Sequence, residues 1–321
     1  MEHLRTRSHS TMSEIAIRTE NLTRDFGSVR AVDDLGLEIP AGIVFGFLGP
    51  NGSGKTTTIR LLLGLLEPAR GRADVLGFDT QTQADAIRER CGALLEHAGL
   101  YERLSAEDNL ELYGRIWRIS AADRKARTKE LLTHFGLWER RGEKVAGWSR
   151  GMRQKLAVAR SLLHRPSLVF LDEPTAGLDP MAAASLRDDL LSLAGREGVT
   201  IFLTTHNLTE AEKLCALVGV IRAGRLLAVG HPDQLRTRAG SHQAVILGRG
   251  FSEQALASLR ERPEVAAAAL QDGRLVIGLK KEVEIAPLIS LLVNSGAQVE
   301  EAHKGKASLE EVFLSLMEEE K

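Results

Sequence analysis

Apolar and polar residues follow one pattern up to about Gly230 and a different one beyond it. In the first region, which starts at Ile15, short apolar runs bounded by turn residues alternate with segments of helical periodicity. This order is typical of strands and helices wound into an α/β sheet. From about residue 105 to residue 164 helical periodicity dominates, so we expect an inserted helical subdomain there. The clearest buried strands are expected at Val44–Leu48, Leu168–Leu171 and Thr200–Leu203.

A second, smaller domain is predicted over residues 241–321. Its pattern reads strand, helix, strand, strand, helix, with a further strand near Val299 and a hairpin turn at Asp272–Gly273. This order suggests a small ferredoxin-like α+β module that follows an α/β domain of residues 15–235. The expected elements are Ala244–Leu247 (strand), Glu253–Arg260 (helix), Val265–Leu270 and Leu275–Leu279 (hairpin strands) and Ile285–Val293 (helix).

A last helix is predicted to begin at Ser308, which forms a capping box with Glu311. The apolar residues after it recur on one helix face, and we interpret them as a packing surface rather than a cofactor site. This module carries no recognisable catalytic group, and its amphipathic last helix motivates our hypothesis that it has a role in dimer support or regulation. The apolar residues of the face are Leu309, Val312, Phe313 and Leu316.

Composition narrows the class of protein. Across 321 residues, 42 Lys and Arg nearly balance 43 Asp and Glu, so no overall positive field favours binding to nucleic acid or anionic lipid. The two cysteines, Cys91 and Cys215, belong to no metal-ligand cluster, which favours reduced thiols in a cytosolic protein. No apolar stretch approaches the ~20 residues that span a bilayer. We interpret the polar residues 1–14, which include a second methionine at position 12, as a disordered leader or as a start site assigned too early.

A phosphate-binding loop follows the first predicted buried strand. Residues 49–56 match G-x-x-x-x-G-K-[ST], between that strand and a helical pattern, which is the context that the motif requires. The glycines let successive N–H groups point inward, and the helix adds the positive end of its dipole. We expect Lys55 to reach the β- and γ-phosphates and Thr56 to bind Mg²⁺. The expected nucleotide-binding residues here are Gly49, Pro50, Asn51, Gly52, Ser53, Gly54, Lys55, Thr56 and Thr57.

Two acidic residues, Asp172 and Glu173, end the predicted strand that starts at Leu168. In open parallel sheets ligands bind at the carboxyl ends of the strands, so both residues should lie beside the phosphate-binding loop. Asp172 suits Mg²⁺ binding. Glu173 points elsewhere because successive strand residues alternate, and it suits a general base for the attacking water.

Three further motifs indicate which class of P-loop protein this is. Residues 148–155, Trp-Ser-Arg-Gly-Met-Arg-Gln-Lys, resemble the signature of ABC (ATP-binding cassette) proteins, whose commonest form is L-S-G-G-Q. Residues 176–179 look like the D-loop of that family, and Thr204-Thr205-His206 look like its H-loop. With the P-loop, these motifs stand in the family's order, so residues 15–235 resemble an ABC cassette, an ATPase of the P-loop NTPase fold. A P-loop kinase would not explain the signature or His206.

The resemblance implies a head-to-tail dimer that holds two ATP molecules, each between the P-loop of one subunit and the signature of the other. Ser149 and the backbone of Gly151 would then touch the γ-phosphate bound by the partner, at a helix N-terminus. His206 would contact the γ-phosphate and hold the catalytic geometry with Glu173. Asp179 would shape the dimer seam.

Three positions allow more than one interpretation. Phe26 stands where this family places an aromatic residue that stacks on adenine, although a core position suits a phenylalanine nearly as well. The Q-loop glutamine of the family aligns with Glu96, whose carboxylate can still face Mg²⁺ if its extra charge is offset. Arg150 replaces the first signature glycine, where its guanidinium either adds positive charge near the triphosphate or is solvated.

Four segments are similar to those of exporter ATPases for drugs, antibiotics and polysaccharides, daunorubicin-type resistance ATPases included. They are Leu100–Leu110, Glu210–Cys215, Gly219–Gly230 and Leu309–Leu314. The resemblance implies a separate integral membrane permease, with this chain in the cytoplasm on the inner face of the cell membrane. The alternative is a soluble ABC ATPase that acts on ribosomes or nucleic acid. Members that act on ribosomes usually carry two cassettes, and members that act on DNA usually carry a long coiled-coil or zinc insert. This chain shows one cassette and a short helical insert, so we expect no nucleic-acid partner.

Overall fold

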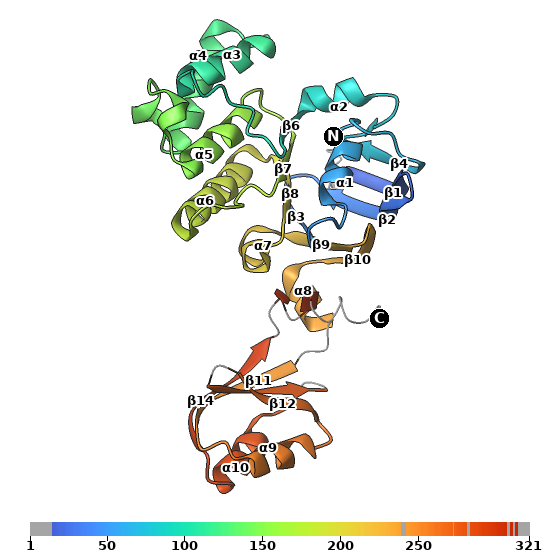
Figure 1. The fold of residues 1–321 in the computed structure, drawn as a ribbon, viewed down its shortest axis with the longest axis vertical. Coiled ribbons are helices and arrows are strands. Elements are labelled where there is room, and N and C mark those ends of the chain that lie inside the picture. The colour runs from blue at the N-terminus through green and yellow to red at the C-terminus, as the bar shows by residue number, and fades with distance from the viewer. Residues whose placement is uncertain are drawn as a thin grey trace, which may run out of the picture. The chain divides into compact units, whose positions relative to one another are not determined.

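The computed structural model describes residues 15–238, 242–271, 273–280, 283–306, 309–310 and 312–313. The chain forms two compact units (Figure 1). The first ends at Leu227, earlier than residue 235, the end of the α/β domain expected from the sequence. The leader predicted at residues 1–14, the capping box of Ser308 and Glu311, and Leu316 lie outside the described residues. None of the helices in the described ranges has both the length and the apolar character that crossing a membrane requires.

Two sheets form the framework of the first unit. A four-stranded sheet has the order β2-β1-β4-β5, and a six-stranded sheet has the order β10-β9-β3-β8-β7-β6. In the larger sheet β9, β3, β8, β7 and β6 pair in parallel, so the carboxyl ends of β3, β8 and β7 lie side by side. The strands are β1 (Ile15–Phe26), β2 (Val29–Pro40), β3 (Val44–Leu48), β4 (Arg70–Val75), β5 (Phe78–Asp79), β6 (Cys91–Leu94), β7 (Leu168–Asp172), β8 (Thr200–Thr205), β9 (Leu217–Arg222) and β10 (Arg225–Gly230).

The three strands predicted from their apolar runs are β3, β7 and β8, which are the central strands of the larger sheet. Four phenylalanine rings from these strands pack against one another, and Phe45 and Phe202 have ring centroids 5.2 Å apart. Phe47 and Phe170 are also fully buried. Strands covered on both faces need continuous apolar runs rather than alternation, which is why the sequence pattern identified them.

Helices surround the larger sheet and form the insert. Three of them, α3, α4 and α5, begin after Ser105, Ser120 and Ser149, and each serine side chain accepts a hydrogen bond from the backbone N–H three residues on. Such caps satisfy donors that a helix cannot pair internally. The helices are α1 (Lys55–Leu62), α2 (Ala84–Arg90), α3 (Ala106–Ile116), α4 (Ala121–His134), α5 (Arg150–Ser161), α6 (Pro180–Glu197) and α7 (Leu208–Leu214), with short 3-10 turns at Trp138–Arg140 and Val145–Gly147.

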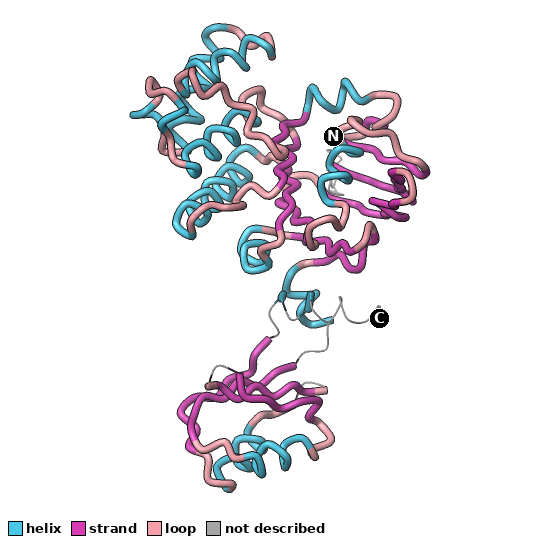
Figure 2. The backbone as a smooth tube through the Cα atoms, in the orientation of Figure 1, coloured by secondary structure: helices cyan, strands magenta, loops and turns pink. Residues whose placement is uncertain are grey.

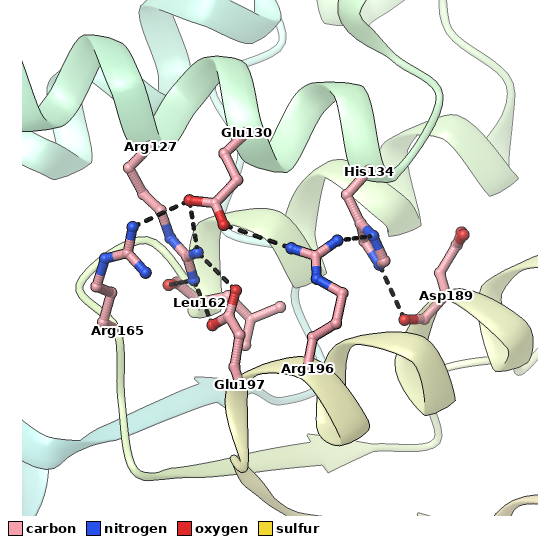
Figure 3. A network of polar contacts seen from close by, with 8 residues as sticks. All are labelled: Arg127, Glu130, His134, Leu162, Arg165, Asp189, Arg196 and Glu197. Carbon is pink, nitrogen blue, oxygen red and sulfur yellow. Dashed lines mark hydrogen bonds and ion pairs between the residues drawn. The ribbon is translucent and has the colours of Figure 1, made fainter.

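A network of charged side chains fastens the helical insert to the end of α6 (Figure 3). Arg127 of α4 is almost fully buried, with 2% of its surface exposed. Its two terminal nitrogens donate to the carboxylate of Glu197 at 2.7 and 2.8 Å, and Nη2 also donates to the carbonyl oxygen of Leu162 at 3.0 Å. Burial alone would lower the pKa of Arg127, but hydrogen bonds to Glu197 and Glu130 outweigh it and raise that pKa. The buried guanidinium is therefore charged and paired.

Replacing Arg127 by Met is expected to destabilise the first unit by about 3 kcal/mol, because the Glu197 carboxylate loses its buried partner. All 3 tryptophans, at positions 117, 138 and 148, lie in the helical insert, so urea unfolding followed by tryptophan fluorescence reports on this unit. Arg165→Ala is the control, since this side chain is 64% exposed and pairs with Glu130 at 3.0 Å. It should cost less than about 1 kcal/mol. Equal unfolding midpoints for the Arg127 variant and the wild type would contradict the assigned role of the network.

The second unit contains a four-stranded sheet of order β12-β13-β11-β14, and its neighbouring strands are antiparallel. Figure 2 shows α9 and α10 together on one face of this sheet. Ile246, Leu259 and Leu292 are among the residues of the core between sheet and helices. The element order is the ferredoxin-like one expected from the sequence, although Asp272 of the predicted turn lies outside the described residues. The elements are α8 (Pro232–Arg238), β11 (His242–Arg249), α9 (Glu253–Arg260), β12 (Val265–Gln271), β13 (Arg274–Leu279), α10 (Ala286–Asn294) and β14 (Gln298–Lys306).

Candidate nucleotide-binding site and catalytic cluster

The P-loop connects the carboxyl end of β3 to the start of α1. Its backbone needs glycine at two points: a β-carbon on Gly49 would lie 2.4 Å from the carbonyl oxygen of Ile221, and one on Gly54, where φ is +106°, would lie 2.3 Å from that of Ala31. Ser53 is 3% exposed, and its hydroxyl has no hydrogen-bond partner within the described part of the chain. A buried unpaired hydroxyl beside a helix N-terminus is what a phosphate group would satisfy.

Lys55 lies in the wall of this loop with 6% of its side chain exposed. Its ammonium donates to the carbonyl oxygens of Gly49 and Pro50, at 2.8 and 3.1 Å. The same nitrogen lies 3.3 Å from Oε1 of Glu173. The lysine therefore joins the P-loop to the residue predicted as general base.

Asp172, the last residue of β7, is held by two hydroxyl groups. Thr56 donates to its Oδ2 at 2.6 Å, and Thr204 donates to its Oδ1 at 2.5 Å. The β7–β8 register aligns Asp172 with Thr204. The oxygens of Asp172 and Thr56 are hard donors at the mouth of the P-loop, and they fit Mg²⁺, which takes one or two protein oxygens together with waters and phosphates. Among the described residues no group of three or more His, Cys, Asp or Glu is arranged to hold a metal ion.

Glu173 turns away from Asp172 and lies between Lys55 and His206. Its φ is +48°, an uncommon left-handed conformation for a residue other than glycine. This turn lets its backbone N–H donate to the hydroxyl of Thr204 at 2.9 Å. The carboxylate then meets Lys55 on one side and, through Oε2, Nδ1 of His206 at 3.0 Å on the other. Lys55, Glu173 and His206, predicted separately from three motifs, thus form one cluster.

Sequence reasoning noted Thr204 only as a neighbour of His206 and missed its function. Thr204 is fully buried, donates to Asp172 and accepts from the backbone of Glu173, so it fixes both acids. The only signal was its place in the Thr-Thr-His motif. Glu210 was missed in a similar way: this 5% exposed acid accepts hydrogen bonds from Thr175 and Thr205 and so ties the loop after Glu173 to α7.

A cleft of about 460 Å³ opens beside this cluster. Its wall includes three carboxylates, those of Glu96, Asp172 and Glu173, and two cations, Lys55 and Arg150. The other residues that line it are Ala31, Asn51, Gly52, Gly54, Thr56, Thr57, Leu94, Leu95, Ala98, Gln154 and Ala176. Most of the P-loop residues predicted to bind nucleotide thus face one cavity large enough for a cofactor-sized ligand.

The signature and D-loop residues lie elsewhere. Ser149 caps α5 by accepting from the N–H of Met152, and Asp179 caps α6 by accepting from that of Ala182. Gly151 lies against α6, where an added β-carbon would be 3.1 Å from the Ala182 methyl carbon. Unlike Arg150 and Gln154, none of Ser149, Gly151 and Asp179 lines the cleft of its own subunit.

Glu96 lies in the wall of the cleft, whereas Phe26 lies outside it. Glu96 lines the cleft, and its carboxylate pairs with Arg60 at 3.1 Å, which offsets its charge. Phe26 is 46% exposed, so the interpretation as a core residue is wrong. The guanidinium of Arg24 lies over its ring, 4.7 Å from the ring centroid. The ring does not line the cleft.

The fold and this cluster define a P-loop nucleoside triphosphatase. A family model described as ABC transporter matches residues 32–176. The daunorubicin resistance ATP-binding protein DrrA3 of Streptomyces coeruleorubidus is 37% identical over 307 residues, which cover 95% of this chain and 96% of the relative. The Nod factor export ATP-binding protein I of Cupriavidus metallidurans is 38% identical over 94% of this chain and 96% of its own length.

A solved structure described as the ATP-binding subunit of an ABC transporter matches with a TM-score of 0.63 and 31% identity, over 70% of this chain and 93% of its own. This chain therefore belongs to the ABC transporter family, as a single-cassette ATP-binding protein, and it is an ATPase. The predicted fold class and the predicted enzyme class are confirmed.

Proposed function

We propose that this chain powers export through a separate membrane permease by binding and hydrolysing ATP. The observation that carries the proposal is the single cluster in which Glu173 meets Lys55 and His206, next to the hydroxyl-bound Asp172. Such a cluster supplies phosphate binding, metal binding and a general base within one cleft.

The phosphates of ATP would bind the backbone N–H groups of the P-loop, the hydroxyl of Ser53 and the ammonium of Lys55. We assign Thr56 and Asp172 to Mg²⁺, with Glu96 nearby in the cleft wall, and the bound metal would offset the charge of the phosphates. Phe26, exposed at the end of β1, is the candidate for stacking on adenine.

Glu173 is the proposed general base. Because a triphosphate attracts the Lys55 ammonium that lies 3.3 Å from Glu173 Oε1, nucleotide binding would free this oxygen for a water. The carboxylate takes a proton from the water as the water oxygen attacks the γ-phosphorus. The bond from that phosphorus to the bridging oxygen breaks, and ADP leaves with the electron pair. His206 fixes the carboxylate from its other side and faces the γ-phosphate.

A head-to-tail dimer accounts for the residues that do not line their own cleft. In it, Ser149 and Gly151 would reach the γ-phosphate of the partner, and Asp179 would lie at the seam. ATP binding would close this dimer and hydrolysis would open it. This alternation would drive the movement of the permease.

Export is favoured by relatives named for daunorubicin resistance and for Nod factor export, each covered over nearly its whole length. The chain would then act at the cytoplasmic face of the membrane, bound to its permease. Its net charge of −1 offers no general attraction to nucleic acid, so the soluble alternative has no support here.

The exporter proposal is tested by isolating the affinity-tagged chain from membranes and from cytosol of cells that contain it at native level. We expect an integral membrane protein in fixed ratio with the chain, and ATPase activity that rises when the two are reconstituted in vesicles. Recovery with ribosomes or nucleic acid instead, and never with a membrane protein, would overturn the exporter role but leave the ATPase assignment intact.

A further inference from the structure

Arg150, the departure from the family's signature glycine, has a specific position in the structure. A β-carbon built on Gly177 would lie 2.4 Å from Cζ and Nη1 of Arg150 and 2.6 Å from Nη2. Near-equal distances to three guanidinium atoms mean that the flat group covers Gly177. Gly177 follows Glu173 in the loop that leads to α6, and Arg150 lines the nucleotide cleft with Glu173 and Ala176. The guanidinium therefore lies on the catalytic side of the cleft.

The start of α5 is fixed to α6, which holds Arg150 in this place. Gly151 packs against Ala182, and one turn further on Lys155 donates to the hydroxyl of Ser185 at 2.8 Å and pairs with Asp189 at 2.7 Å. Contacts within the same subunit therefore fix the backbone position from which the long side chain of Arg150 extends.

The charges around Arg150 favour an anionic ligand. Each of the three carboxylates in the cleft wall already has a partner: Arg60 for Glu96, two hydroxyls for Asp172, and Lys55 with His206 for Glu173. Arg150 itself has no ion pair or hydrogen bond from its side chain to any residue in the described ranges. It is also the first residue of α5, a helix with no acidic residue in its first turn. A cation at the positive end of a helix is unfavourable unless an anion is near.

We infer that Arg150 binds the γ-phosphate of the nucleotide in the cleft of its own subunit, and so determines the preference for ATP over ADP. The inference deepens the proposed function and rests on it, because it requires the nucleotide to occupy this cleft. The guanidinium needs only to move from the face of Gly177 towards the phosphates, and it contributes a charge-assisted hydrogen bond that ADP does not receive.

The test compares Arg150→Ala and Arg150→Lys with Arg153→Ala, a matched control on the same helix that does not line the cleft. Binding of Mg²⁺ with the β,γ-imido analogue of ATP, and of Mg²⁺ with ADP, is measured by calorimetry at protein concentrations where light scattering reports monomers. We expect Arg150→Ala to bind the triphosphate analogue about tenfold more weakly, the lower end of what one charge-assisted bond contributes. ADP affinity should change less than about threefold, Arg150→Lys should recover most of the loss because it keeps the charge, and Arg153→Ala should match the wild type.

Three results would overturn the inference: an unchanged affinity for the triphosphate in Arg150→Ala, equal losses for triphosphate and ADP, or a loss that arises only at concentrations where the protein dimerises. The last would mean that Arg150 binds the nucleotide of the partner. A purely structural clamp on Gly177 would instead lower the unfolding temperature of the nucleotide-free variant, which we expect to stay within about 2 °C of the wild type. Lys55→Ala separates the two proposals: if it binds nucleotide normally the proposed site fails, whereas a silent Arg150→Ala beside a defective Lys55→Ala removes only this inference.

Discussion

Replacing Glu173 by Gln is expected to reduce ATP turnover by at least about 100-fold and to leave nucleotide affinity within about threefold of the wild type. Glutamine keeps the shape of the side chain and a hydrogen-bond acceptor towards His206, but its amide cannot take a proton from water. The backbone N–H of residue 173 still donates to Thr204, so the turn after β7 should be retained. Turnover falls because one chemical step is lost, not because the site is rearranged.

Phosphate release measures turnover, calorimetry measures affinity, and size-exclusion chromatography with Mg²⁺ and ATP shows the assembly state. Because hydrolysis is proposed to open the dimer, the Glu173 variant should elute as an ATP-dependent dimer. Glu89→Gln makes the same chemical change at a 72% exposed position on α2 and should hydrolyse ATP normally. If Glu173→Gln also turned over at the wild-type rate, Glu173 would not be the base.

The parts of the site that could be predicted are those that are local in sequence. A P-loop needs a strand, a glycine-rich turn and a helix in direct succession, and residues 44–62 contain all three. Asp172 and Glu173 were predictable for the same reason, because an apolar strand of a parallel sheet ends in polar residues at the ligand side. The conformation of Glu173 was not, because it depends on Thr204, which reaches it only through the pairing of β7 with β8.

Contacts between distant segments account for most of what was missed. No local pattern links Arg127 to Glu197 or Lys55 to Glu173, because each pair depends on how the insert and the strands fold back on each other. The antiparallel pairing of β1 with β2 and β4 also lacks a clear signal, since its strands contain several polar residues and register shifts. In the second unit the element order followed from periodicity, but the strand order β12-β13-β11-β14 required the tertiary structure. For Phe26 the sequence allowed both a core position and an exposed position that stacks on adenine, and only the exposed fraction of the side chain excluded the core position.

Replacing Lys55 by Ala is expected to weaken nucleotide binding by about 100-fold, which corresponds to the loss of a buried charge-assisted contact, and to abolish hydrolysis with it. The ammonium is nearly enclosed, and among the residues that the structure describes its polar contacts are Glu173 and the two P-loop carbonyls. Its charge is therefore available to a triphosphate with little competition from solvent. Lys125→Ala, on the exposed face of α4, removes the same charge from the surface and should bind ATP normally.

A second set of variants distinguishes phosphate binding from support of the fold, because Lys55→Ala also leaves the Glu173 carboxylate without one partner. Lys55→Met keeps most of the buried stem, and the double variant Lys55→Met with Glu173→Gln removes the unpaired charge as well. We expect the double variant to regain the unfolding midpoint of the wild type, followed by tryptophan fluorescence, and to remain about 100-fold weaker in ATP affinity. Affinity that recovered together with stability would mean that Lys55 acts on the nucleotide only through the fold of the P-loop, and the phosphate contact would be withdrawn.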